Sequence, residues 1–323
     1  MKNISEIFEG GTYEKQKKKK ITFYCICVTF AIIVAMLLVL VIFGIVSFVT
    51  QKADEKPNQD QTVVTVGETQ AVTLSQENIY SGILLLLDST HPFKGKVDTV
   101  VIRSHEGRPK KPSTQEGTEG GNIYSILAGG TTEDKDFRGT ADAVDALNLM
   151  LKDFYTARQD DNLCIAHAFT KANAATDDPV YASGTAFSLE YYFDYSANKN
   201  DIRSIYGVEK YDWIYSNAHK YGFITVKSGK TDENGNEIGS NVFRYVGVPH
   251  ATYMVAKKLD LNAYLEQLRG ATPDAPILTK VGKVTYASYY ISADGEHLVP
   301  VNYEYSISGN NSDGYIVSAI ITK

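Results

Sequence analysis

Cysteine is scarce in this chain of 323 residues, which contains three. Cys25 and Cys27 lie in an uncharged apolar run, so Cys164 stands alone in the rest of the chain and no internal disulfide can form there. In the apolar string LCIA, we expect Cys164 to be a small buried hydrophobe, because a reactive thiolate needs an accessible, electropositive setting. The scarcity excludes a disulfide-stapled fold and argues against a thiol nucleophile.

The chain also lacks a surplus of positive charge and a histidine cluster. The formal net charge is −6, and residues 1–20 carry +3, so the chain after Lys20 carries about −9. An acidic domain of this kind does not attract nucleic acid by charge. The six histidines are scattered, without the H-x-x-E-H spacing or a similar spacing that marks a zinc site.

One long hydrophobic run is present, at residues 21–50, and it contains no charged residue. It exceeds the roughly 20 residues that cross a bilayer, and it is about twice as long as the apolar region of a cleaved signal peptide. Lysines crowd its N-terminal flank, so the positive-inside rule predicts a cytoplasmic tail at residues 1–20. We therefore expect a single-pass protein of the cell membrane with an extracellular C-terminal domain.

The part of the chain after this run divides by composition. Residues 51–75 mix Gln, Asp, Glu and Thr with one proline, which is typical of a linker, and we expect a stalk there. We place the principal domain at residues 76–270. The strings KVTYASYYIS, VNYEYSISG and GYIVSAIITK alternate in character, and they predict a C-terminal extension of β-hairpins at residues 271–323.

Periodicity within the principal domain predicts an α+β fold. The string TADAVDALNLMLKDFYTAR at residues 140–158 places apolar residues at helical spacing on one face, and Thr140 or Asp142 can cap its start. The strand-length apolar runs lie at residues 82–93, 97–104, 162–169 and 183–196, and further helices are expected at residues 211–223 and 250–269.

Six strings follow one another along residues 78–270: GILLLLDSTHPF, AVDALNLMLKDFY, SGTAF, WIYSNAHKYGFI, FRYVGVPHATYM and LDLNAYLEQL. In this order they closely resemble the VanY-type D-alanyl-D-alanine carboxypeptidases. The resemblance implies helices packed on an antiparallel sheet, a Gram-positive cell surface, and zinc-dependent removal of the terminal D-alanine from peptidoglycan stem peptides.

In that family, zinc is held by protein ligands with an open position for water, and a carboxylate acts as general base. A family motif of the form H-x-x-G-x-A-x-D aligns here on Gly184 and Ala186. This alignment places Tyr181 at the position of the first histidine and Ser188 at the position of the aspartate. A phenol and a hydroxyl group are poor zinc ligands.

The second family motif, E-x-x-H directly before F-R-Y-V-G, is changed in the same way. Its alignment places Gly239 at the catalytic glutamate and Val242 at the second histidine. Neither residue has a donor atom in its side chain. The resemblance therefore predicts a chain without catalytic residues, metal ligands or cofactor, although its active relatives use zinc.

The substrate-binding motif has also changed. Relatives carry S-G-Y-R-S, whose arginine can hold a carboxylate through two hydrogen bonds, whereas the aligned string here is HAFTK, with Thr170 at the arginine position. The substrate-pocket candidates that the resemblance leaves are His167, Thr170, Tyr181, Ser188, Arg244 and Tyr245.

These changes favour a membrane-anchored pseudoenzyme that binds a peptidoglycan stem peptide or a cell-surface protein, and no nucleic acid. Two alternatives stay open. A divergent active carboxypeptidase would use relocated ligands, of which His167 with Asp177 or Asp178 is the nearest set. A non-enzymatic interaction module of a membrane complex would use the tyrosine-rich extension.

Overall fold

The computed structural model describes residues 64–104, 122–123, 126–127, 136–160, 162–171, 179–193, 202–229, 233, 235 and 239–322. All of them belong to one compact unit of the chain, Val63–Lys323. No helix within these described ranges is long and apolar enough to cross a bilayer. The predicted tail at residues 1–20 and the predicted span at residues 21–50 lie outside the described residues.

The principal sheet has six strands, and its pairings are antiparallel except for one parallel pair, β5 with β7. The strands follow the order β10, β11, β8, β7 and β5, and β9 also pairs with β8. Their bounds are β5 (Ile126–Leu127), β7 (Leu163–His167), β8 (Ala186–Tyr192), β9 (Ile202–Ser204), β10 (Phe223–Thr225) and β11 (Val242–Tyr245). The mixed helix and sheet content agrees with the α+β class predicted from the sequence.

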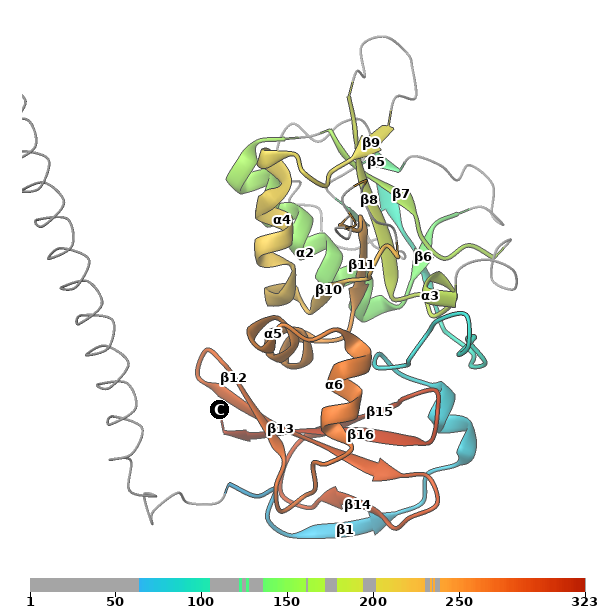
Figure 1. The fold of residues 1–323 in the computed structure, drawn as a ribbon, viewed down its shortest axis with the longest axis vertical. Helices are drawn as coiled ribbons and strands as arrows, with labels where there is room; N and C mark the ends of the chain where they lie inside the picture. Colours follow the sequence, from blue (N-terminus) through green and yellow to red (C-terminus); the bar gives the residue numbers. More distant parts are fainter. Residues whose placement is uncertain are drawn as a thin grey trace, which may run out of the picture. The chain divides into compact units, whose positions relative to one another are not determined.

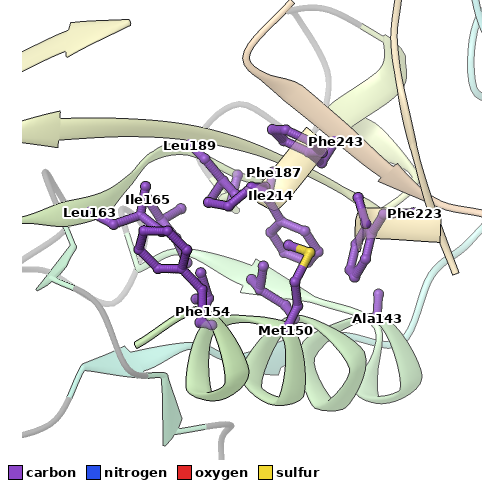
Figure 2. Packing of buried hydrophobic residues seen from close by; sticks show 14 of the residues in the cluster. Ala143, Met150, Phe154, Leu163, Ile165, Phe187, Leu189, Ile214, Phe223 and Phe243 are labelled. Carbon is purple, nitrogen blue, oxygen red and sulfur yellow. The ribbon is translucent and has the colours of Figure 1, made fainter. Parts of the chain in front are cut away.

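Helices α2 (Ala141–Arg158) and α4 (Asp212–Asn217) pack against one face of this sheet (Figure 1). The apolar side chains of α2 that were predicted to share a face are all buried. Figure 2 shows Met150 and Phe154 of this helix pointing toward Phe187 and its neighbours on the strands. Each large side chain buried here contributes on the order of 1.5–3 kcal/mol, so this face holds the sheet and the helices together.

A second, four-stranded antiparallel sheet follows in the order β12, β13, β16 and β15. Helices α5 (Val248–Lys257) and α6 (Leu261–Leu268) pack against it and share its apolar cluster (Figure 1). The strands are β12 (Ile277–Val281), β13 (Val284–Ser292), β15 (Tyr305–Gly309) and β16 (Gly314–Thr322). The alternating strings of the predicted extension therefore do form strands, and these strands enclose a core.

The last part of the predicted stalk, residues 64–75, lies in the folded unit. Strand β1 (Thr69–Val72) pairs in antiparallel register with β14 (His297–Pro300). The N–H of Val66, just ahead of β1, donates to the carbonyl of Pro273 at 3.0 Å, and Val66 is buried in the second core. The alternation of apolar and polar residues in β1 is short and lies among polar residues, so the sequence did not predict a strand here. A few apolar residues are nevertheless enough to hold the segment on a sheet.

The apolar run at residues 82–93 is not a strand, although its length and composition predicted one. Its N–H groups bond to isolated partners instead of a neighbouring strand: Leu84 N–H donates to Ser308 Oγ at 2.9 Å, and Leu86 N–H to the Asn310 carbonyl at 3.0 Å. Leu84 is buried in the second core and Leu85 against the principal sheet. The run is apolar because its side chains are buried both in the second core and against the principal sheet.

Short elements complete the described fold. The run at residues 97–104, predicted as one strand, forms two short ones, β2 and β3, with different partners. The bounds are η1 (Gln76–Tyr80), β2 (Val100–Val101), β3 (Arg103–Ser104), β4 (Asn122–Ile123), β6 (Arg138–Gly139), α3 (Pro179–Ala182), η3 (Glu209–Tyr211) and η4 (Ala218–Tyr221).

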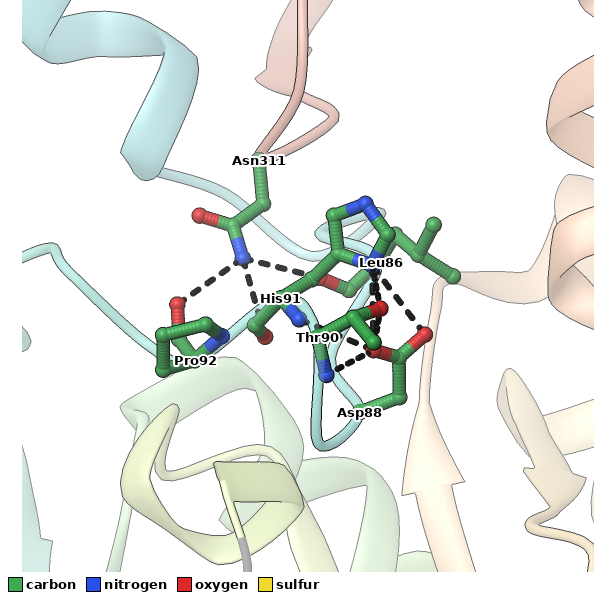
Figure 3. Close-up of polar contacts among 6 residues, drawn as sticks. All are labelled: Leu86, Asp88, Thr90, His91, Pro92 and Asn311. Atoms are coloured by element: carbon green, nitrogen blue, oxygen red, sulfur yellow. Dashed lines mark hydrogen bonds and ion pairs between the residues drawn. The ribbon is translucent and has the colours of Figure 1, made fainter.

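Asn311, in the turn between β15 and β16, fastens the 82–93 segment to the second sheet (Figure 3). Its amide nitrogen donates to the carbonyls of Leu86 at 2.8 Å, Pro92 at 3.1 Å and His91 at 3.3 Å. Asn311 itself has a φ of 62°, in the left-handed region that asparagine tolerates better than most residues. One side chain thus joins two segments that lie more than 200 positions apart.

Two substitutions of Asn311 distinguish the contribution of its amide hydrogen bonds from that of its left-handed backbone conformation. Asn311→Gly keeps the left-handed backbone and loses the donor, which should cost on the order of 1–3 kcal/mol of unfolding free energy. Asn311→Ala should cost about 1 kcal/mol more, because alanine is also strained at positive φ. Urea unfolding of both variants, with exposed Asn302→Ala as control, measures the difference. Equal losses for glycine and alanine would contradict the strain argument.

A chain of buried hydrogen bonds ties α5 to the second sheet. His250 lies within 2.8 Å of the Tyr264 hydroxyl through Nδ1 and within 3.1 Å of Ser318 Oγ through Nε2, and Ser318 contacts Ser288 at 3.0 Å. Burial lowers the pKa of His250 to about 4, so the ring is neutral, and one nitrogen donates while the other accepts.

Because the folded-state pKa of His250 lies below its ordinary value of 6.5, the unfolded chain takes up this proton first as the pH falls. The stability contributed by neutral His250 is complete above about pH 6.5 and is lost as the pH falls toward 4. The loss between pH 7 and pH 4.5 should be on the order of 2–3 kcal/mol. His250→Gln, which cannot titrate, should show a correspondingly smaller pH dependence in urea unfolding. An unchanged pH slope in the variant would refute the assignment to His250.

Candidate functional site

Strands β7, β8 and β11 bring His167, Ser188 and Val242 together. The register of β8 with β11 sets Ser188 directly opposite Val242, and the register of β7 with β8 sets the same Ser188 opposite His167. Directly paired residues on neighbouring strands point to the same face of a sheet. His167, Ser188 and Val242 therefore form one row, which we call the site row, on the face away from α2.

The orientation of His167 depends on an irregularity in β7. Ile165 points into the core beneath α2, and regular alternation would send the side chain two positions later to the same face. The pairing instead shifts between Ile165 and His167, so the side chain of His167 turns to the face of Ser188. A bulge of this kind changes the face to which a side chain points, and the sequence pattern did not predict it.

Tyr181 reaches the site row from α3. The rings of His167 and Tyr181 have their centroids 6.4 Å apart. Tyr181 and Val242 both pack against a small apolar cluster, whose buried members are Leu85, Leu87, Val180 and Ala186. The three positions that the resemblance assigns to metal ligands thus lie near one another, beside this apolar cluster.

Gly239, at the position of the catalytic glutamate, lies against an aromatic ring. A Cβ atom added to Gly239 would stand 1.9 Å from Cε2 and 2.2 Å from Cδ2 of Tyr206. The ring of Tyr206 therefore occupies the space in which a side chain at position 239 would begin. Sequence reasoning missed Tyr206, because a contact between loop residues 33 positions apart leaves no local pattern.

The donor set at these positions does not fit zinc. Tyr181 and Ser188 offer neutral oxygens, and Val242 offers none, whereas protein zinc sites use imidazole, thiolate and carboxylate. In the described part of the chain, no three histidine, cysteine, aspartate or glutamate side chains are grouped to hold a metal ion. Asp177 and Asp178, the alternative partners for His167, lie outside the described residues.

Arg244 shares the face of the site row, two positions after Val242 on β11. Its side chain is buried, at 3% exposure, and its Nη2 donates to the carbonyl of Leu85. Its Nε has no partner within the described residues. Burial lowers the pKa of Arg244 to about 10, so the guanidinium stays charged at neutral pH. The face therefore holds one positive charge able to attract an anionic group.

The other two pocket candidates lie elsewhere. Tyr245 is three positions from Val242 and points to the opposite face, where its ring packs on Phe223 with centroids 5.5 Å apart. Thr170 is buried just beyond the end of β7. The residue before it, Phe169, bridges to Arg138, whose guanidinium donates to the side chain and carbonyl of Thr99 at 2.8 and 2.6 Å.

Comparison with known proteins supports this fold and the resemblance stated above. No protein-family profile matches the chain. A D-alanyl-D-alanine carboxypeptidase of Enterococcus faecium is 27% identical over 285 residues, which cover 83% of this chain and 85% of that protein. The crystal structure of the vancomycin resistance D,D-dipeptidase VanXYg, in complex with a D-Ala-D-Ala phosphinate analogue, superposes with a TM-score of 0.55 and 19% identity. It covers 79% of this chain and 100% of that chain.

The chain therefore shares the fold of this D,D-dipeptidase. Its sequence is similar to that of a D-alanyl-D-alanine carboxypeptidase over most of both chains, in agreement with the resemblance that the ordered strings indicated.

The contact between Gly239 and Tyr206 can be measured by substitution. Gly239→Ala should lower the unfolding free energy by on the order of 1–3 kcal/mol, because the new methyl group overpacks the tyrosine ring. In a Tyr206→Ala background the same change should cost much less. A double-mutant cycle by urea unfolding gives the coupling energy. A coupling near zero would mean that the ring does not limit position 239.

Proposed function

We propose that this protein is a membrane-anchored, catalytically inactive member of its family, which binds cell-wall stem peptide without hydrolysing it. The observation that carries the proposal is the residue type at the four positions that the family motifs assign, Tyr181, Ser188, Gly239 and Val242, none of which suits zinc or a general base. A phenol, a hydroxyl and an isopropyl group meet where a metal would need imidazole and carboxylate.

The position of the general base supports the same proposal. A glutamate at position 239 would activate water in an active relative, and here glycine has no side chain for this purpose. The ring of Tyr206 fills the adjacent space, so the loss extends beyond one residue to the packing around it. Both halves of the chemistry, the metal site and the base, are affected together.

A binding role is supported by what remains on the face of the site row. His167 is exposed and Tyr181 is partly exposed, so both can contact a ligand. The buried charge of Arg244 lies on the same face, and a guanidinium favours a carboxylate such as the C-terminus of a peptide. These groups supply attraction and contact for a peptide end.

The extracellular location is part of the proposal. The uncharged run at residues 21–50, preceded by five lysines between positions 15 and 20, supports a single-pass anchor with a cytoplasmic N-terminus. A Gram-positive cell surface would then present the folded unit to peptidoglycan.

Full-length purified protein should contain far less than one zinc ion per chain and should release no D-alanine from a peptide ending in D-Ala-D-Ala. The reason is the absence of ligand atoms at the family positions. Metal analysis by mass spectrometry and a coupled D-alanine assay measure the two quantities. Stoichiometric zinc together with D-alanine release would refute the proposal.

The His167→Ala variant separates this proposal from the divergent active peptidase. If relocated ligands formed a working site, the variant would lose both metal and turnover. On the proposal made here, neither quantity changes. Binding of N-acetyl-Ala-D-Ala-D-Ala, a probe without an amine, should instead weaken, whereas exposed Glu77→Ala serves as the control.

The interaction-module alternative needs a test other than removal of residues 278–323. Strands β13, β15 and β16 lie within that range and carry part of the second core, including Tyr289 and Tyr315, so deletion would expose the apolar faces of α5 and α6. Substitution of Tyr305, which is 39% exposed, leaves that core in place. Loss of a partner protein on Tyr305→Ala, without loss of peptidoglycan capture, would favour the module.

A further inference from the structure

Exposed apolar side chains gather around one end of the second sheet. Eight large hydrophobic side chains are clearly exposed among the described residues, and four of them lie on this sheet or on the segments next to β1 and β14. These four are Val64, Leu278, Val301 and Tyr305, with exposed fractions between 39% and 43%. The other four are distributed over the principal domain and α5.

Strand register places Leu278 and Tyr305 on the same face of the second sheet. Leu278 pairs with Ala287, Ala287 with Ala319, and Ala319 with Tyr305, so the four residues form one row across all four strands. Ser318, one position before Ala319, points to the other face, where it contacts α5. The row therefore lies on the face away from α5.

Strand β14 covers part of that face and ends near the row. Tyr289 and Tyr315 alternate in phase with the row, and their hydroxyls donate to the carbonyls of Leu298 and Ser75, each at 2.8 Å. The segments that contain these carbonyls therefore cover the middle of the face. Val301 directly follows β14 and is exposed, and the two ends of the row remain exposed as well.

The chain enters the folded unit beside these side chains. Val64 is the first described residue, and the N–H of Val66 donates to the carbonyl of Pro273, just ahead of β12, at 3.0 Å. The N–H of Val301 donates to the carbonyl of Glu68 at 3.0 Å, so the entering segment is bonded to the residue that follows β14. We call the four exposed side chains the entry patch, which consists of Val64, Leu278, Val301 and Tyr305.

The sequence ahead of the entry patch limits its distance from the uncharged run at residues 21–50. Residues 51–63 separate the two, and a chain of thirteen residues spans at most about 45 Å. With the run placed in a bilayer, as proposed above, docking of the entry patch on that bilayer is an intramolecular event. Its effective concentration is then on the order of millimolar, so a weak contact suffices to populate the docked state.

The chemistry of the entry patch suits a lipid surface. Tyrosine is favoured at the boundary between headgroups and acyl chains, because its ring is apolar and its hydroxyl stays hydrated. Lys280 lies two positions after the leucine of the patch and points to the same face, and Lys283 follows in the next turn. Glu68 and Glu304 are exposed in the same region and offset these charges. The contact therefore depends chiefly on the apolar side chains.

We propose that the entry patch docks on the surface of the lipid bilayer in which the chain is anchored. The inference rests on the anchor that the proposed function includes, and it adds that the second sheet, rather than the principal sheet, meets the membrane. A second copy of the chain is a weaker candidate, because four partly exposed side chains offer far less than the roughly 800 Å² per partner of a stable interface.

Tryptophan fluorescence of the full-length protein in lipid nanodiscs tests this proposal. Tyr305→Trp places a fluorophore in the entry patch, and bromine atoms on the acyl chains quench tryptophan only at short range. Leu149→Trp, at an exposed position of α2, is the matched control. The unchanged protein, whose single tryptophan is Trp213, gives the emission to be subtracted from both variants.

We expect brominated lipid to lower the emission of Tyr305→Trp about twofold and that of Leu149→Trp by less than about a tenth, because only the entry patch lies at the headgroup boundary. Adding Leu278→Ser and Val301→Ser to Tyr305→Trp should restore most of the emission. Both positions are exposed, so the melting temperature should stay unchanged.

Quenching confined to Tyr305→Trp supports the proposal. Equal emission in the two lipids would overturn it, and so would equal quenching of the two tryptophan variants. Absence of quenching together with a concentration-dependent dimer that Val301→Ser abolishes would assign the entry patch to a second copy instead. A chain that does not insert into nanodiscs would refute the anchor and this inference together. Binding of N-acetyl-Ala-D-Ala-D-Ala at the site row is measured without lipid, so that part of the proposed function is tested separately.

Discussion

The register of β8 with β7 and β11 is the constraint on which the described site depends. Because side chains alternate along a strand, the pairing of Ser188 with both Val242 and His167 decides which residues meet on the outer face and which lie beneath α2. A slip by one residue would bring Phe187 to the outer face and Ser188 into the core. The apolar side chains buried against α2 make such a slip costly, so the core preserves the geometry of the site row.

The bulge in β7 adds a second determinant. Ile165 contributes to the core, and His167 is turned out beside Ser188, so one strand serves packing and site within three positions. The face that results combines hydrocarbon, neutral hydroxyl groups, one exposed imidazole and a buried guanidinium from Arg244. On the proposed function, such a face would hold a peptide end by contact and charge.

Much of the architecture could be predicted from the sequence because local periodicity carried it. The helix at residues 140–158, the strands containing Leu163 and Phe187, and the helix that ends at Gly222 all have patterns of their own. Alignment to the family motifs predicted that Tyr181, Ser188, Gly239 and Val242 stand at the functional positions. The clustering of the first, second and fourth of these positions follows from strand pairing, which the motifs imply only through the family fold.

Other features could not be predicted, since they arise from contacts between distant residues. The run at residues 82–93 has the composition of a strand, yet Asn311 and Ser308 bind its backbone one group at a time. Tyr206 beside Gly239 and the shift in pairing before His167 leave no trace in nearby residues.

The pairing of β1 with β14 has a mechanical consequence. Tension applied to the chain ahead of Val64 reaches the folded unit first at this short ladder, and the ladder passes it to the sheet that follows α6. Strands β7, β8 and β11 lie further along this load path. In a molecule held at its N-terminus, tension would therefore strain the second sheet before it reached the principal sheet and the site row.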